Sequence, residues 1–231
     1  MNFISKAKQF LCDFRGKKNF EFIPTDSLDA DQWAKRIREI TPKSLHDHLH
    51  GSGKGPGFWT SAEKRPAPAR SLQRAGKLFD RMKGKIIVEI GSGLQGHGAG
   101  NSALVWYKNT AAIKIFCVDP DPRALQSVRK QIPDTRRLIC AEQDGAGFIE
   151  AFQDSIDLLY LDFWQNSARE RANAYLHLYE KASKKMSPAS LLLIDDTDHA
   201  DPWKQTWIVP AACRDGFRVM WCGRQTLLLR K

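Results

Sequence analysis

Three glycines lie close together in the middle of the chain, at Gly91, Gly93 and Gly96. They directly follow an apolar run over residues 85–90 and precede a stretch whose apolar residues have helical spacing. Such a loop presents backbone N–H groups and the positive end of a helix to a ligand, and the missing side chains let the ligand approach. The spacing therefore predicts a site for a nucleotide-like cofactor, with Ser92 in the same loop.

Two acidic residues sharpen this prediction. Asp119 follows the next apolar run, where a carboxylate can accept hydrogen bonds from both hydroxyl groups of a ribose; the alternative is a turn residue before Pro120. Glu89 precedes the first glycine, where a carboxylate suits the ammonium of a methionine moiety better than a pyrophosphate. The glycines also fit the dinucleotide fingerprint, so a nicotinamide-dependent dehydrogenase is a rival hypothesis. It is disfavoured, because few residues follow Ile194 to form a separate substrate domain.

A second group of carboxylates, Asp162, Asp195 and Asp196, follows two later apolar runs. The carboxyl ends of parallel strands meet at one edge of a sheet, so we expect these side chains to converge there. Their oxygens suit Mg²⁺, which can bind a substrate hydroxyl and lower its pKa. The alternative is that Asp195 and Asp196 cap the next turn while Asp162 alone contacts cofactor or substrate.

Several further residues are candidates for the same pocket. His199 could act as a general base, because its ordinary pKa lies near neutral pH; the alternative is a solvated loop histidine. Trp203 and Lys204 could help to shape the pocket, although neither belongs to a motif.

An alternating set of histidines, His46, His48 and His50, lies near the N-terminus. Three imidazoles can form a zinc site. A lid that excludes water from the substrate, with Phe58 and Trp59 as apolar contacts, is the favoured reading. An ordinary surface loop is the third possibility.

The elements that must position these residues alternate between strand and helix. Short apolar runs predict five buried strands, at residues 85–90, 113–118, 137–140, 156–161 and 190–194. A helix is predicted over residues 68–82, and another begins at a capping box at Ser167, with an apolar face that continues to Met186. Two last strands, 217–222 and 226–229, are too close for a parallel crossover and must form an antiparallel hairpin. The pattern predicts an α/β fold whose sheet is covered on both faces.

Composition and charge set the wider frame. The 231 residues suit one sizeable domain, and no apolar stretch is long enough to span a bilayer. Five cysteines without a Cys-x-x-Cys spacing, and an N-terminus without the apolar region of a secretory signal, predict reduced thiols and a cytoplasmic location. Most of the net charge of +10 falls in residues 1–85. This basic segment could attract phosphate groups or nucleic acid, or be a solvated face.

The ordered motifs resemble class I S-adenosylmethionine-dependent methyltransferases over residues 68–231. They comprise residues 88–93, Val118-Asp119, residues 157–162 and the closing hairpin. The resemblance implies a Rossmann-like doubly wound seven-stranded sheet of order 3-2-1-4-5-7-6 with an antiparallel last strand. It also implies a residue set for the cofactor: the ribose on Asp119, the methionine end near Glu89 and Gly91, and the adenine near Gln143 and Asp144. Residues 1–67 lie outside the resemblance, and their own helical apolar spacing and Gly- and Pro-rich stretch predict a helical extension with a flexible lid-like loop.

The set formed by Asp162, Asp195 and Asp196 further resembles the metal ligands of metal-dependent O-methyltransferases of small molecules. This implies methylation of a small-molecule hydroxyl, with Mg²⁺ as a second cofactor. Related sequences commonly have a Gly and a His soon after the first aspartate, whereas residues 163–166 here are Phe-Trp-Gln-Asn. Two alternatives remain: an RNA methyltransferase that uses the basic N-terminal segment, and a non-catalytic cofactor-binding scaffold.

Overall fold

The computed structural model describes residues 70–92, 101–163, 168–195, 197, 204–221 and 225–230. Several sequence-based predictions lie outside these residues. They are the N-terminal extension with its lid and the histidines His46, His48 and His50, the glycines Gly93 and Gly96, the cap at Ser167, and Asp196, His199 and Trp203.

Seven strands form one sheet in the order β3-β2-β1-β4-β5-β7-β6. Strands β1 to β5 run parallel, and β7 is antiparallel to both β5 and β6. The fold class, the strand order and the closing hairpin are therefore as predicted. The strands are β1 (Ile86–Ile90), β2 (Lys114–Val118), β3 (Leu138–Ala141), β4 (Ile156–Leu161), β5 (Met186–Ile194), β6 (Phe217–Trp221) and β7 (Thr226–Arg230).

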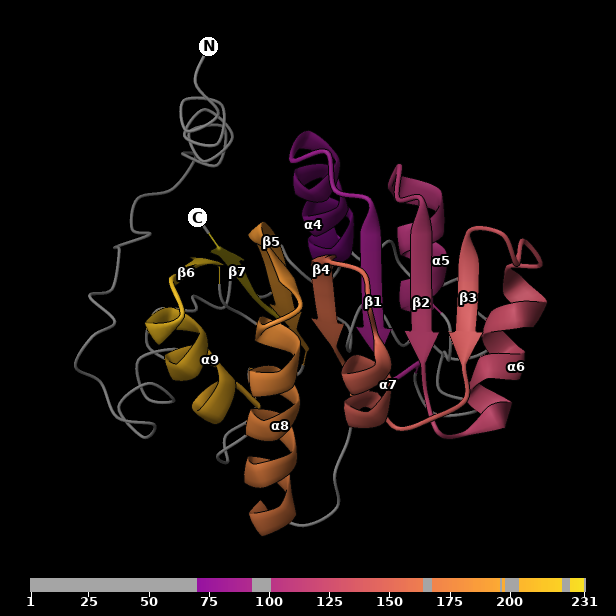
Figure 1. The fold of residues 1–231 in the computed structure, drawn as a ribbon. Coiled ribbons are helices and arrows are strands. Elements are labelled where there is room, and N and C mark those ends of the chain that lie inside the picture. Colours follow the sequence, from indigo (N-terminus) through magenta and orange to yellow (C-terminus); the bar gives the residue numbers. More distant parts are fainter. Residues whose placement is uncertain are drawn as a thin grey trace, which may run out of the picture.

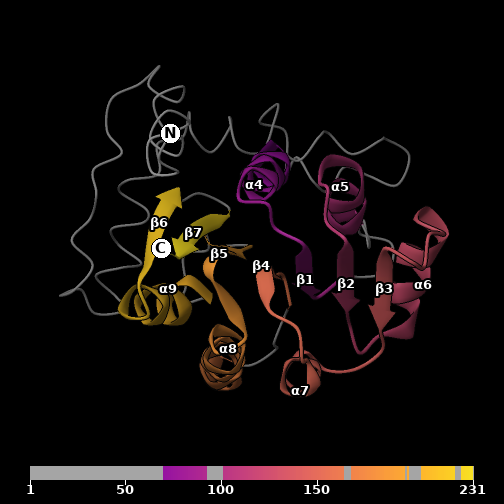
Figure 2. The same cartoon turned by 45° about the horizontal axis from the view of Figure 1, so that its top comes forward.

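Helices cover both faces of the sheet (Figures 1 and 2). One face packs against α4 (Arg70–Arg81), α5 (Asn101–Asn109) and α6 (Pro122–Gln131). The other packs against α7 (Gly145–Ala151), α8 (Ala168–Ser183) and α9 (Lys204–Arg214). Central strands are consequently apolar on both faces, as in other doubly covered parallel sheets, which is why they appear as unbroken apolar runs.

The junction between α8 and β5 differs from the prediction. The helix ends at Ser183, so Met186 does not continue its apolar face but begins β5, before the predicted start at Ser190. Met186 pairs with Ile156, after which the register shifts and Leu191 pairs with Leu158. This irregularity contains the exposed Pro188, which lacks a backbone donor and interrupts the apolar pattern.

Among the described helices, none combines the length and the apolar character needed to cross a membrane.

Candidate cofactor and catalytic site

The turn after β1 requires glycine. Gly91 has φ of +91°, and a Cβ there would lie 2.6 Å from the carbonyl oxygen of Asp162. Its N–H donates to the carbonyl of Val118 at 2.9 Å. Gly91 thus lies between the ends of β1 and β4, where the strand order reverses, and a doubly wound sheet binds its ligands in the crevice at that point.

Asp119 fixes the first part of the glycine loop. Its Oδ2 accepts a hydrogen bond from the backbone N–H of Ser92 at 2.8 Å, and its Oδ1 accepts one from the N–H of Asp121 at 2.8 Å. Each carboxylate oxygen has a second lone pair that these bonds do not use. The Ser92 side chain is buried, and its hydroxyl has no hydrogen-bond partner among the described residues. The loop thus offers polar groups at the place where the sequence predicts a cofactor.

Glu89 lies on the face of β1 that packs against α5, not in the loop. It is fully buried, and its carboxylate accepts hydrogen bonds from Ser102 Oγ at 2.6 Å and from Trp106 Nε1 at 3.0 Å, both on α5. Burial raises the pKa of Glu89 to about 8, against the lowering effect of these two hydrogen bonds. The role of Glu89 toward a methionine ammonium stays a prediction. Ser102 and Trp106 were missed, although their i,i+4 spacing places them on one helix face.

Gln143 and Asp144 follow β3 at the same edge of the sheet. Asp144 caps α7, because its Oδ1 accepts a hydrogen bond from the N–H of Gly147 at 2.9 Å. The beginning of α7 packs closely on β1, since a Cβ on Gly145 would lie 2.4 Å from Ile90 Cγ2. This places both residues near the crevice, and their contact with an adenine stays a prediction.

Asp162 and Asp195 come together at the ends of β4 and β5. They directly follow Leu161 and Ile194, which are paired in the sheet, and the N–H of Asp195 donates to the carbonyl of Leu161 at 3.0 Å. The backbones of these two aspartates therefore lie side by side at the edge of the sheet, as expected, and a joint role of their side chains stays a prediction.

Asp195 is 1% exposed and accepts a hydrogen bond from Tyr160 Oη at 2.9 Å. Gln225 Nε2 donates to the same hydroxyl at 3.3 Å, and Ser71 Oγ donates to Gln225 Oε1. Burial raises the pKa of Tyr160 well above its ordinary value, and the neighbouring carboxylates raise it further. Tyr160 therefore stays a neutral donor. This role was not predicted from the sequence, because Tyr160 lies inside an apolar run.

Lys204, the first residue of α9, faces Asp162. Its Nζ lies 3.8 Å from Asp162 Oδ1, and the two side chains are 1% and 9% exposed. Lys204 was a candidate for shaping the pocket, although it belongs to no motif. Its burial was not predicted, because a single lysine in a polar stretch carries no signal of burial.

The described residues at this edge do not fit the predicted Mg²⁺ site. An ion bound to Asp162 Oδ1 would lie about 2 Å from that oxygen. It would then be within about 6 Å of the Lys204 ammonium, and two cations so close in a buried site repel strongly. Within the described ranges, no three His, Cys, Asp or Glu side chains are grouped to hold a metal; Asp196 lies outside those ranges.

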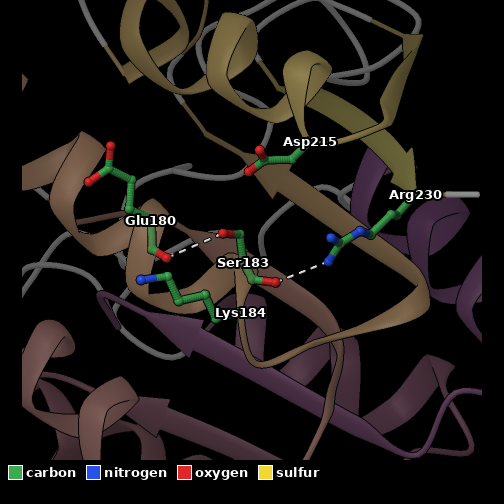
Figure 3. Close-up of a pocket in the computed structure, with 5 residues that line it drawn as sticks. All are labelled: Glu180, Ser183, Lys184, Asp215 and Arg230. Atoms are coloured by element: carbon green, nitrogen blue, oxygen red, sulfur yellow. Dashed lines mark hydrogen bonds between the residues drawn. The ribbon is translucent and has the colours of Figure 1, made fainter.

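A polar cavity of about 390 Å³ lies elsewhere on the molecule (Figure 3). It is lined by Glu180, Ser183, Lys184, Asp215 and Arg230, and Arg230 Nη1 donates to the carbonyl of Ser183 at 3.0 Å. These residues lie at the end of α8, the end of β7 and the turn before β6. The cavity contains none of the residues predicted for cofactor or catalysis.

Comparison with solved structures identifies the fold. A putative O-methyltransferase from Klebsiella pneumoniae superposes with a TM-score of 0.55 at 15% identity, covering 98% of this chain and 96% of that one. The O-methyltransferase TomG from Streptomyces achromogenes, solved in complex with SAM, gives 0.54 at 13% identity, covering 89% and 100%. A methyltransferase from Geobacter sulfurreducens gives 0.51 at 14% identity, covering 96% and 94%.

No model of a known protein family matches the sequence, and no curated protein does. The chain has the class I S-adenosylmethionine-dependent methyltransferase fold. This is shown by the strand order with its single antiparallel strand and by the similar solved structures.

Proposed function

We propose that the chain is an S-adenosylmethionine-dependent methyltransferase. The observation that supports this most directly is the junction of Gly91, Ser92 and Asp119, where a close backbone turn and a fixed carboxylate meet at the point of strand-order reversal. This is where a doubly wound sheet binds a nucleoside. The similar structures, TomG with SAM among them, support the same reading.

Different residues of the chain would bind different parts of S-adenosylmethionine. Asp119 would accept hydrogen bonds from the ribose hydroxyls with the lone pairs left by Ser92 and Asp121. The Gly91 turn, with Gly93 and Gly96 further along the loop, would let the methionine part approach the backbone, and Glu89 would lie beneath it. Gln143 and Asp144 would border the adenine. When bound, S-adenosylmethionine supplies an electrophilic methyl group.

We propose a small-molecule hydroxyl as the acceptor. Asp162 and Asp195 put carboxylates at the edge of the sheet beside the cofactor crevice, where a hydroxyl can be oriented by hydrogen bonding. His199 is the proposed proton acceptor. Names of similar structures support oxygen as the methylated atom, since two of the three reported above are O-methyltransferases.

Calorimetry with S-adenosylhomocysteine and with NAD tests the proposal on the full chain. We expect saturable binding of S-adenosylhomocysteine and none of NAD. The reverse result would overturn the proposal and favour a dehydrogenase. A screen of small hydroxyl compounds with labelled S-adenosylmethionine then tests the acceptor class, and label transferred to RNA instead would contradict it.

A further inference from the structure

We infer that Lys204 itself provides the positive charge at the edge of the sheet where Asp162 and Asp195 follow β4 and β5. Its ammonium occupies the position beside Asp162 that a divalent ion would otherwise take. This inference deepens the proposed function and rests on it for the place where the acceptor binds. Lys204 is then a positioning residue for Asp162 in a site that works without a metal.

The burial of the pair is the first argument. Lys204 and Asp162 are 1% and 9% exposed with 3.8 Å between Nζ and Oδ1. Lys181 and Glu150 approach more closely, at 2.6 Å, but their side chains are 29% and 71% exposed. An ammonium removed from water is strongly unfavourable unless an opposite charge lies near it. The charge of Asp162 therefore stabilises the buried Lys204, and the charge of Lys204 stabilises the buried Asp162.

The place of Lys204 in its helix is the second argument. It is the first residue of α9, and the first turn of that helix contains no acidic residue. The N-terminal end of a helix carries a partial positive charge, which favours acidic side chains and disfavours a lysine. Helix formation therefore does not account for a lysine here, whereas the ion pair with Asp162 does.

Asp195 provides the third argument, because the chain supplies a polar partner to this carboxylate as well. Tyr160 Oη donates to Asp195 Oδ2 at 2.9 Å, and Gln225 in turn donates to Tyr160. The two described carboxylates of the predicted metal set thus each have a polar partner from the protein: an ion pair at Asp162 Oδ1 and a hydrogen bond at Asp195 Oδ2. A divalent ion at Asp162 Oδ1 would be repelled by the Lys204 ammonium, and one at Asp195 Oδ2 would compete with the Tyr160 hydroxyl.

A metal titration of the full chain tests the inference directly. Thermal melting is followed with Mg²⁺ and with Mn²⁺, against EDTA, for the parent, Lys204→Met and the surface control Lys181→Met. We expect no saturable change in Tm for the parent or the control. Lys204→Met should gain one, of about 5 °C at high excess of ion, because the ammonium no longer occupies the position. Asp162→Asn added to Lys204→Met should remove the gain.

Two results would overturn the inference. A saturable rise in the parent that Asp162→Asn abolishes would show that an ion binds with Lys204 in place. A folded Lys204→Met whose Tm changes with neither Mg²⁺ nor Mn²⁺ would show that the carboxylates form no cation-binding site.

A second measurement decides the question if Lys204→Met does not fold. Asp162→Asn alone, melted in EDTA, should lower Tm, because it leaves the buried ammonium without its partner charge. If Asp162 and Asp195 instead formed an empty metal site, neutralising one repelling carboxylate would raise Tm. A rise would therefore contradict the inference.

These measurements contain neither methyl donor nor acceptor. Failure of the lysine inference would leave the binding of S-adenosylhomocysteine unaffected. Failure of cofactor binding would likewise leave the metal response of Lys204→Met to be observed.

Discussion

The backbone N–H of Ser92 donates to Asp119 Oδ2 at 2.8 Å, which ties the loop after β1 to the end of β2. The same carboxylate accepts from Asp121 through its other oxygen, also at 2.8 Å. Asp119 thus shapes the loop, and its remaining lone pairs give it a second, proposed function as an acceptor for the cofactor. The two functions can be separated by substitution.

Asp119→Asn should keep one carbonyl acceptor for the loop or the ribose but lose the charge, whereas Asp119→Ala should lose all of these bonds. We expect affinity for S-adenosylhomocysteine to fall about 10-fold to 100-fold in Asp119→Ala and less in Asp119→Asn, as hydrogen bonds to a charged group contribute about 1.5–3 kcal/mol. Calorimetry measures both, with Asp154→Ala as a control on an exposed ion pair. Equal affinity in parent and Asp119→Ala would remove Asp119 from the cofactor site.

Gly91→Ala should be damaging at the same turn. Its φ of +91° disfavours any L side chain, and the new methyl group would lie 2.6 Å from the Asp162 carbonyl oxygen. We expect a loss of about 2–4 kcal/mol in the free energy of unfolding, measured with urea. The control is Gly216→Ala, which shares the positive φ, at +87°, but has no atom within 4 Å of the added Cβ. Equal losses in the two variants would show that backbone conformation, not the close contact, sets the cost.

The sequence was sufficient to predict the sheet because its central strands are buried on both faces. The runs that became β1, β2 and β4 are apolar and too short for a typical buried helix, and their predicted ends agree with the structure within a residue. Where an element is irregular, the pattern fails: Pro188 and the register shift in β5 concealed the pairing of Met186 with Ile156.

The site was predictable where backbone geometry dictates residue type, or where an aspartate directly follows a predicted strand. Gly91 is required by its dihedral angle and by contact with Asp162, so spacing alone located it. Lys204 and Tyr160 could not be found in this way, because their roles depend on partners far along the chain, Asp162 and Asp195. Nothing local in the sequence distinguishes a buried, paired lysine from a solvated one.

Glu89 predicts a pH dependence of stability. Its carboxyl pKa is 4.5 in an ordinary environment and about 8 in the fold. Between these values the folded chain holds a proton that the unfolded chain has released, so stability falls as the pH rises through this window, by at most about 1.4 kcal/mol per pH unit. Glu89→Gln stays neutral and should lack this fall. The free energy of unfolding is measured with urea from pH 5 to pH 8. The value of the parent minus that of Glu89→Gln should become steadily more negative as the pH rises.

The surface variant Glu150→Gln is the control for this series. Lys181 holds the pKa of Glu150 below its usual range, so the contribution of Glu150 to stability is nearly constant above about pH 6. If the free energies of unfolding of the parent and Glu89→Gln differ by a constant amount over this pH range, Glu89 is ionised in the fold.

Tyr160→Phe should act through Asp195 rather than through packing. The ring is fully buried and packs edge-on against Trp106 at a centroid distance of 5.7 Å, and phenylalanine preserves that contact. Only the hydroxyl is lost, which leaves the buried Asp195 without this donor and Gln225 without this acceptor. We expect a loss of about 1–3 kcal/mol in the free energy of unfolding.

A double-mutant cycle identifies where that energy comes from. In an Asp195→Asn background the charge that needs the hydroxyl is gone, so Tyr160→Phe should cost less there than in the parent. The difference is the coupling between the two side chains, for which about 1 kcal/mol is expected from a buried hydrogen bond to a carboxylate. Leu159→Val, on the opposite face of β4, supplies a matched core substitution whose cost should be the same in both backgrounds. If Tyr160→Phe is likewise independent of residue 195, the hydroxyl does not hold Asp195, and any loss of methyl transfer in that variant must be sought in Gln225 and Ser71 instead.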